Sequence, residues 1–232
     1  MKVVILAGGL GTRLSEYTKT IPKPMVEIKK KPILIYIMEH FARYGYTDFY
    51  IALGYKAEVI IDYFKKNKFN LWNINLIKTG KNVMTGGRIK RLKKYLKNEK
   101  DFFLTYGDGV SNINLKKVLR FHKKNKKVAT ISAVRPPARF GYIKLKNTKV
   151  RYFKEKSSLN EGWINGGFMV LNKKIFNYIK GDHTYLERDP LEKLSKKGEL
   201  YAYKHSGFWQ CMDTVRDKEI LEKHLKNKNY FE

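Results

Sequence analysis

The amino-acid sequence predicts an α/β fold of three layers, in which helices cover both faces of a mixed, mainly parallel central sheet. Short β-branched runs alternate with amphipathic helical patterns from Val3 to Val134, which is typical of parallel strands joined by right-handed crossovers. From Phe140 to Leu171, strand-like segments follow one another with room for only one short helix between them, which predicts an antiparallel addition to the sheet. The 232 residues, 43% of them hydrophobic, can bury one large core. We expect a single domain over residues 1–232.

The elements of the first part of the chain are marked by apolar periodicity and by helix-end signals. The run from Val3 to Ala7 stops at glycines and predicts a buried strand, and Pro32 and Gly45 bound a helix. Further helices are expected at 57–66 and 87–96 and after Asn114, and strands at 49–53, 74–78, 102–106 and 128–134. The functional loops of such a sheet gather at the carboxyl ends of its strands.

The remainder of the chain is expected to contain more antiparallel structure. Strands are predicted at 142–145, 150–155 and 168–171, helices at 186–197 and 215–227, and a strand pair at 200–203 and 208–212.

The charge of the chain is strongly positive. It carries 49 Lys and Arg residues against 21 Asp and Glu, a formal net charge of +28. Nucleic acid, an acidic membrane surface, a nucleotide or a sugar phosphate would each suit such a surface, although paired lysines on polar helix faces usually serve solubility. The single cysteine, Cys211, rules out an intrachain disulfide and predicts a cytoplasmic protein. The apolar start from Met1 to Leu10 is too short for a membrane helix, so no membrane insertion is expected.

The strongest chemical signal is the glycine-rich loop after the first strand. Three glycines within Gly8-Gly9-Leu10-Gly11-Thr12-Arg13-Leu14 let backbone amides approach an anionic phosphate chain. The spacing is neither the dinucleotide-binding pattern nor a P-loop, which disfavours hydride transfer and NTP hydrolysis. The same glycines would also suit an ordinary glycine-rich turn that binds nothing. Arg13 and Lys23 add positive charge where phosphates would lie, which favours a nucleotide-binding loop.

This loop, followed by Lys23-Pro24, resembles the nucleotidyltransferase family that includes the sugar-nucleotide pyrophosphorylases, and within it the glucose-1-phosphate cytidylyltransferases. The resemblance covers nearly the whole chain through Met84-Thr85-Gly86-Gly87-Arg88, Thr105-Tyr106-Gly107-Asp108-Gly109, Pro136-Pro137 with Arg139-Phe140-Gly141, Glu155-Lys156, Ile164-Asn165-Gly166-Gly167-Phe168 and Phe208-Trp209-Gln210 with Met212-Asp213-Thr214. It implies a Rossmann-like nucleotidyltransferase fold, with a nucleotide-binding half at 1–135 and an acceptor-binding half with the second metal ligand at 136–232.

The resemblance also implies a reaction, in which CTP and glucose 1-phosphate give CDP-glucose and pyrophosphate with the help of Mg²⁺. Asp108 and Asp213 would hold the metal, and Arg13, Lys23 and Asp108 would be the catalytic residues. Acceptor binding would fall to Glu155, Lys156, Asn165 and Gly166. Nucleotide binding would fall to Leu6, Ala7, Gly8, Gly9, Gly11, Thr12, Arg13, Lys23, Thr85, Gly86, Arg88, Tyr106 and Gly107.

The residues themselves leave several points open. A carboxylate such as Asp108 at the end of a buried strand is costly unless it is paired or holds a metal, whereas Asp213 alone would also suit a helix cap. UTP, dTTP or another phosphorylated acceptor are alternatives, and a nucleic-acid-binding protein on the same fold is a rival that the retained site residues argue against. The segment from Phe64 to Thr79 is shorter than in the cytidylyltransferases, which leaves the acceptor and a homo-oligomer open.

Overall fold

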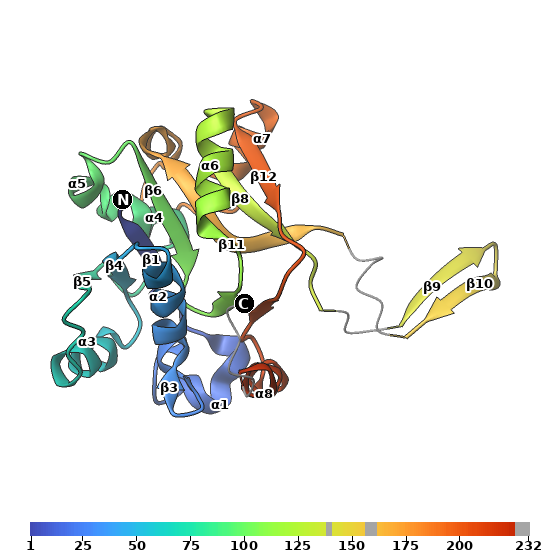
Figure 1. Ribbon diagram of the computed structural model, residues 1–232, viewed down its shortest axis with the longest axis horizontal. Coiled ribbons are helices and arrows are strands. Elements are labelled where there is room, and N and C mark those ends of the chain that lie inside the picture. The colour runs from blue at the N-terminus through green and yellow to red at the C-terminus, as the bar shows by residue number, and fades with distance from the viewer. Residues whose placement is uncertain (138–140, 156–161, 226–232) are drawn as a thin grey trace.

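The computed structural model describes residues 1–137, 141–155 and 162–225. A seven-stranded sheet lies at the centre of the molecule (Figure 1), with the strand order β12-β8-β11-β6-β1-β4-β5. The strands of this sheet are β1 (Val3–Ala7), β4 (Asp48–Leu53), β5 (Asn73–Lys78), β6 (Asp101–Tyr106), β8 (Ala129–Val134), β11 (Ile164–Asn172) and β12 (Leu200–Lys204).

Helices cover both faces of the sheet, which confirms the predicted three layers. One face packs against α2 (Ile33–Arg43), α3 (Ala57–Lys66), α6 (Leu115–Asn125) and α8 (Val215–His224). The other face packs against α4 (Thr85–Arg91), α5 (Lys93–Leu96), the 3₁₀ turn Lys173–Tyr178 and α7 (Asp189–Lys196). Side chains alternate along a strand, so Val3, Ile5 and Ala7 of β1 enter the first core while Val4 and Leu6 enter the second. A strand buried on both faces must be apolar throughout, as β1 is.

The sheet is mixed and mainly parallel, as the sequence predicts. β1 is parallel to both β4 and β6, β4 is parallel to β5, and β12 is parallel to β8. β11 is antiparallel to both of its neighbours, β6 and β8. Because β11 comes from the second half of the chain and both neighbours come from the first, the two halves share one sheet. Their division into nucleotide-binding and acceptor-binding halves stays a prediction.

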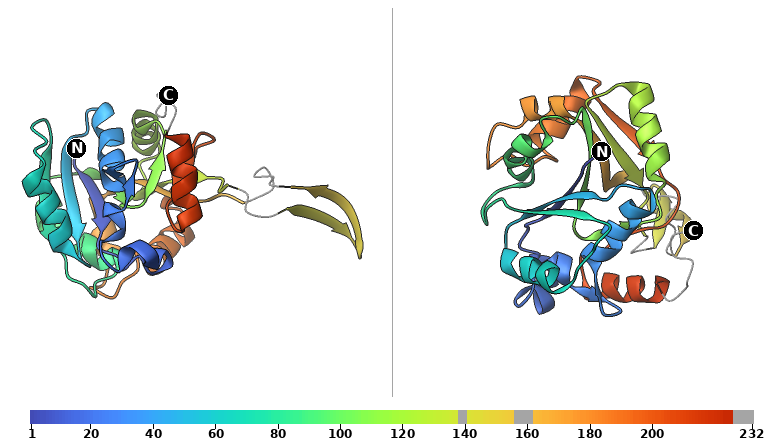
Figure 2. Two further views of the ribbon diagram at one scale, coloured as in Figure 1. Left: turned by 90° about the horizontal axis from the view of Figure 1, so that it is seen from below. Right: turned by 60° about the vertical axis from the view of Figure 1, so that its left-hand side comes forward.

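The hairpin of β9 (Tyr142–Lys146) and β10 (Lys149–Lys154) corrects part of the sequence prediction. These strands pair with each other and project away from the central sheet (Figure 2), so only β11 is the expected antiparallel addition. Lysine and arginine alternate with apolar residues along both strands. Because each face of the central sheet lies under helices, a strand with such a charged face would bury charge there.

The strands at the end of the chain also differ from the prediction. β12 and β13 (Trp209–Cys211) do not pair with each other, because β13 instead joins β7 (Gly109–Ser111) in an antiparallel pair. The helix expected at 87–96 is interrupted at Leu92, whose N–H bonds to both Arg88 O and Ile89 O, giving α4 and α5. The end predicted for the last helix, Asn227, lies outside the described residues.

Short elements that the sequence analysis did not foresee connect β1 to α2. They are the 3₁₀ turn Thr12–Leu14, α1 (Ser15–Thr18), the 3₁₀ turn Lys23–Met25, β2 (Glu27–Ile28) and β3 (Lys31–Pro32). Within the described part of the chain, no helix combines the length and apolar character needed to cross a membrane.

Candidate active site

A cavity of about 330 Å³ opens at the carboxyl ends of β1 and β6. It is lined by the glycine-rich loop after β1, by residues 83–85 with Arg88, by residues 106–108, by Lys23 with Pro24, and by Tyr185. β1 has β6 on one side and β4 on the other, so the connections leave the edge of the sheet in opposite directions here. Ligands of open α/β sheets bind at such a switch point.

Arg88 of α4 holds the glycine-rich loop from below. Its buried guanidinium donates hydrogen bonds to five acceptors, namely Gly8 O at 2.8 Å, Gly80 O at 2.7 Å, Thr79 Oγ1 at 2.7 Å, Leu53 O at 3.1 Å and Lys81 O at 3.3 Å. A Cβ atom at Gly8 would lie 2.2 Å from Arg88 Nη1, so the loop approaches the guanidinium closely only because this residue is glycine. The arrangement places a buried positive charge directly beneath the loop.

Lys23 forms the centre of a charged cluster at the mouth of the cavity. Its Nζ donates to Asp108 Oδ2 at 2.7 Å and to Asp213 Oδ1 at 2.6 Å, and its side chain is 9% exposed. Burial lowers the pKa of Lys23, but the charges and hydrogen bonds of the two carboxylates outweigh burial and leave the pKa above its ordinary value. Arg13 Nη1 donates to Asp213 Oδ2 at 2.8 Å and is 73% exposed, so it faces solvent and any incoming ligand.

The two aspartates meet because β7 and β13 pair. Asp108 directly precedes β7, Asp213 follows β13 by two residues, and Met212 N donates to Asp108 O at 2.9 Å across the pair. Thr214, not Asp213, is the N-cap of α8 and forms a capping box with Asp217. Burial raises the pKa of Asp213, but Lys23 and Arg13 outweigh burial and lower the pKa below its ordinary range. Because Thr214 is the N-cap of α8, the structure does not support the helix-cap alternative for Asp213.

Comparison with known proteins identifies the family of this chain. Residues 2–226 match the nucleotidyl transferase family. The chain belongs to this family. It is 46% identical to the glucose-1-phosphate cytidylyltransferase of Salmonella typhimurium over 243 aligned residues, which cover 96% of this chain and 95% of the relative. It is 41% identical to a probable glucose-1-phosphate cytidylyltransferase of Bacillus subtilis over 96% of this chain and 94% of the relative.

A solved structure supports the same grouping. The crystal structure of HddC from Yersinia pseudotuberculosis complexed with GMP-PN superposes with a TM-score of 0.77 at 31% sequence identity, covering 97% of this chain and 99% of that one. A UDP-glucose pyrophosphorylase complexed with UDP-glucose, 19% identical, shares the fold with a TM-score of 0.73 and covers 98% and 99% of the two chains. The fold predicted from the sequence is thus confirmed as that of a nucleotidyl transferase.

The structure gathers nearly all the residues expected to bind the nucleotide in this transferase. Those that line the cavity are Leu6, Ala7, Gly8, Gly9, Gly11, Thr12, Arg13, Lys23, Thr85, Arg88, Tyr106 and Gly107. Gly86 is not among them, because its N–H donates to Thr184 O at 2.9 Å and a Cβ atom there would contact the same residue. Arg88 lines the cavity while its guanidinium is used by protein acceptors. The family resemblance implies that Arg88 and Thr85 lie at the base and sugar of the nucleotide, and this placement stays a prediction.

The residues expected to bind the acceptor are less tightly grouped. Asn165 Oδ1 accepts from Gly167 N at 3.0 Å, and the Asn165 side chain also hydrogen-bonds to Tyr106, which lines the cavity. Gly166 O accepts from Trp209 Nε1 at 2.7 Å. Glu155 follows β10 at the base of the projecting hairpin, and Lys156 lies outside the described residues. Asn165 thus contacts a residue that lines the cavity, and the roles of all four residues stay predictions.

Glu187, which the sequence analysis missed, joins two residues that line the cavity. Its Oε2 accepts from Thr85 Oγ1 at 2.6 Å and its Oε1 from the hydroxyl of Tyr106, so one carboxylate joins α4 to β6. Burial, together with the charge of Glu187, raises the pKa of Tyr106 well above its ordinary value and keeps the phenol protonated. Tyr185, two residues earlier, lines the cavity directly. Tertiary packing brings Tyr185 and Glu187 to these positions, and no sequence spacing signals them.

The carboxylate pair suits a hard divalent cation. Asp108 and Asp213 both direct an oxygen at the Lys23 ammonium, so the protein already gathers carboxylates around one positive charge. Within the described ranges, no group of three or more His, Cys, Asp or Glu side chains is arranged to hold a metal ion. Mg²⁺ is commonly bound by one or two carboxylates together with substrate phosphates and water. Two aspartates beside a loop suited to phosphate fit that pattern.

Proposed function

We propose that this chain transfers the cytidylyl group of CTP to glucose 1-phosphate, giving CDP-glucose and pyrophosphate. The observation that carries the proposal is the Lys23, Asp108 and Asp213 cluster at the mouth of a cavity walled by a glycine-rich loop. The identity of 46% to a glucose-1-phosphate cytidylyltransferase along nearly the whole chain supports the choice of both substrates.

The proposed reaction is an in-line attack by a phosphate oxygen of glucose 1-phosphate on the α-phosphorus of CTP. A new P–O bond forms, the bond between the α- and β-phosphates breaks, and pyrophosphate leaves with that bond's electron pair. The nucleophile is already an anion, so no general base and no covalent enzyme intermediate are required. The protein must instead hold two polyanions together and stabilise the charge that develops on the transferring group.

Each part of the site has a corresponding proposed task. The amides of the glycine-rich loop receive the triphosphate, and the buried charge of Arg88 below the loop strengthens that preference. Arg13 and Lys23 neutralise the charge that develops during transfer, and Lys156 binds the phosphate of the acceptor. Bound Mg²⁺, held by Asp108 and Asp213, would neutralise phosphate charge as a Lewis acid. Lys23 and Arg13 already set these two carboxylates in place.

Pyrophosphate release tests the proposal. The protein is incubated with Mg²⁺ and each of CTP, UTP, dTTP, ATP and GTP, with and without glucose 1-phosphate, beside an Asp108→Ala control. We expect release with CTP plus glucose 1-phosphate and its loss in the variant. Release with UTP or dTTP but not with CTP would reassign the nucleotide. Release only with another sugar 1-phosphate or with a non-sugar phosphate would reassign the acceptor. No pyrophosphate release with any nucleotide and acceptor, together with steeply salt-dependent binding of generic DNA or RNA, would favour the alternative of a nucleic-acid-binding protein.

A further inference from the structure

A basic cavity of about 530 Å³ lies at the amino end of the central sheet. It is lined by Val128, which directly precedes β8, and by parts of the 3₁₀ turn Lys173–Tyr178 and of α7. The 3₁₀ turn follows β11, which is antiparallel to β6 and β8, so the turn lies at the end of the sheet where those two strands begin. The candidate active site lies at the carboxyl ends of the strands, so the two cavities are separate.

Lysine side chains converge on this basic cavity from three segments of the chain. They are Lys174, Lys180, Lys193 and Lys197. Among the described residues that line the cavity none is acidic, and the polar side chains of Asn177 and Tyr178 can donate hydrogen bonds. The lining therefore offers positive charge and hydrogen-bond donors to a ligand.

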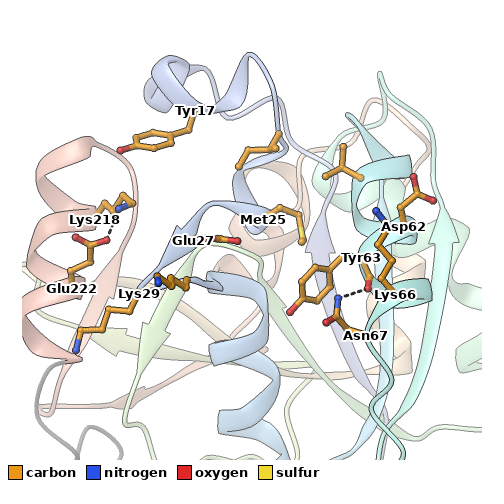
Figure 3. A pocket seen from close by; sticks show the side chains of 13 residues that line it. Tyr17, Met25, Glu27, Lys29, Asp62, Tyr63, Lys66, Asn67, Lys218 and Glu222 are labelled. Carbon is orange, nitrogen blue, oxygen red and sulfur yellow. Dashed lines mark hydrogen bonds and ion pairs between the residues drawn. The ribbon is translucent and has the colours of Figure 1, made fainter.

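The lining of another cavity, of about 780 Å³ between α3 and α8, has a different charge pattern. Figure 3 shows the carboxylates of Glu27, Asp62 and Glu222 among the lysines of that cavity. A carboxylate within a lining repels an anionic ligand and offers a neighbouring lysine a partner. Because the described lining of the basic cavity has no carboxylate, its positive charge is directed at whatever enters it.

The protein itself neutralises only part of this charge. Asp189, which lies outside the lining, is 3.6 Å from Lys180 Nζ and 3.3 Å from Lys193 Nζ, so two ammonium groups share one carboxylate. Lys174 and Lys197 form no ion pair with any residue that the structure describes. Most of the positive charge around the cavity is therefore uncompensated.

Helix electrostatics and solubility do not explain why these lysines converge. Lys193 lies in the last turn of α7 and Lys197 directly follows that helix, where positive charge complements the helix dipole. This effect does not account for Lys174 and Lys180, which belong to other segments. A lysine that serves solubility needs only contact with water, whereas like charges gathered around one hollow repel each other. A bound anion would remove that repulsion.

We propose that the basic cavity binds an oligophosphate, a ligand in which phosphate groups are joined directly to one another, as in tripolyphosphate. Lysine ammonium groups bind phosphate well, and adjacent phosphates present several negative charges within the span of one cavity. Single-stranded nucleic acid is disfavoured because its bases stack on free aromatic rings, and Lys197 Nζ already lies over the Tyr178 ring, 5.5 Å from its centroid. A lipid surface is disfavoured because the lysines surround a hollow instead of forming a flat face.

The experiment is a titration with sodium tripolyphosphate in the absence of Mg²⁺, followed by NMR through the methyl signals of labelled Val128. Val128 lines this cavity and not the candidate active site, so its signals separate binding here from binding of the same anion there. We expect the signals to shift and to saturate in the wild type. Lys174→Gln with Lys197→Gln should weaken this binding about 100-fold, because each charge-assisted hydrogen bond contributes about tenfold in affinity.

The control is Lys116→Gln with Lys117→Gln, which removes the same charge from two exposed positions. Both lysines lie in the first turn of α6, which leads from the carboxyl end of the sheet, away from the basic cavity. At physiological ionic strength their charges are screened from the cavity, so the affinity for tripolyphosphate should change by less than about twofold.

The outcomes decide both the site and the class of ligand. Unshifted Val128 signals, or equal affinities in the wild type and in the Lys174 and Lys197 double variant, would overturn the site. Equal affinities for inorganic phosphate and tripolyphosphate would overturn the assignment of joined phosphates. Tighter binding of single-stranded RNA than of polyphosphate with the same number of phosphates would assign the cavity to nucleic acid. Binding to anionic-lipid vesicles that only this double substitution abolishes, without a response to tripolyphosphate, would assign it to a membrane surface.

The basic cavity does not depend on the proposed function. Its readouts are binding measurements without turnover, so a shift of Val128 that the double substitution abolishes would uphold the site even if no pyrophosphate were ever released. Conversely, release of pyrophosphate from CTP and glucose 1-phosphate with no shift of Val128 would uphold the proposed function and overturn the oligophosphate site.

Discussion

Replacing Arg88 with methionine removes the guanidinium beneath the glycine-rich loop and keeps a side chain of similar length. The change removes one donor from each of five buried or half-buried acceptors, of which Leu53 O keeps Thr79 N and Thr79 Oγ1 as donors and Gly8 O keeps Tyr55 N. Each hydrogen bond to a charged group contributes roughly 1.5–3 kcal/mol, and the cost of burying the guanidinium itself is recovered on substitution. We therefore expect Arg88→Met to lower the free energy of unfolding by roughly 3–5 kcal/mol, which is large for a single substitution.

Arg91, one turn further along α4, offers a matched control. Its side chain is 45% exposed and pairs with Asp182 at 2.6 Å on the surface. An exposed pair contributes about 0–1 kcal/mol and the one further hydrogen bond, from Arg91 Nη1 to Thr79 O at 3.1 Å, is half-buried, so Arg91→Met should lower stability much less than Arg88→Met. Urea unfolding followed by circular dichroism compares the two variants. Equal unfolding midpoints would refute the inference that Arg88 is an internal support. An unchanged midpoint with a raised KM for CTP would instead favour the direct contact with the base that the family resemblance implies.

Three further predictions concern metal binding, pH and backbone conformation. Asp108→Asn and Asp213→Asn should each slow Mg²⁺-dependent pyrophosphate release by about 100-fold or more, as loss of a metal ligand removes several kcal/mol of transition-state stabilisation. Burial lowers the pKa of His40 from 6.5 to about 4, so the unfolded chain binds the proton first as pH falls. The free energy of unfolding should thus decrease by about 3 kcal/mol as the pH falls from 6.5 to about 4, measured by urea unfolding at each pH. Gly167→Ala should lower the melting temperature, because φ is +82° and the new Cβ atom would lie 2.7 Å from the Tyr106 ring.

Each of these predictions has a control. Isothermal titration with Mg²⁺ and CTP should show weaker metal binding in both aspartate variants, and unaltered metal affinity would count against their role as ligands. For the pH prediction, His40→Gln should make the free energy of unfolding depend less on pH, since glutamine does not titrate. An unchanged pH dependence in this variant would mean that other histidines cause it. For Gly167, the comparison is Gly109→Ala, where a Cβ atom meets no other atom within 4 Å and φ is not positive. Equal melting temperatures of the two alanine variants would contradict the argument.

The local features of the site can be predicted from short stretches of consecutive residues. The apolar run of β1 and the glycines that follow it predict a buried strand ending in a loop suited to phosphate, because backbone conformation and burial depend on residues close in the chain. Asp108 at the end of β6 could be recognised for the same reason. The alternation of strands and helices likewise predicts the three layers and the edge of the sheet at which the cavity opens.

Other features depend on contacts between distant segments, which no local pattern encodes. Asp213 reaches Asp108 only because β13 pairs with β7 instead of with β12. Arg88 supports the glycine-rich loop, and Glu187 joins Thr85 to Tyr106, through hydrogen bonds across the fold. The sequence by itself determined the layered fold, the loop and the types of charged residue available. Tertiary structure decided which charges meet and which face the cavity, since side-chain partners depend on how strands separated by many residues are placed side by side.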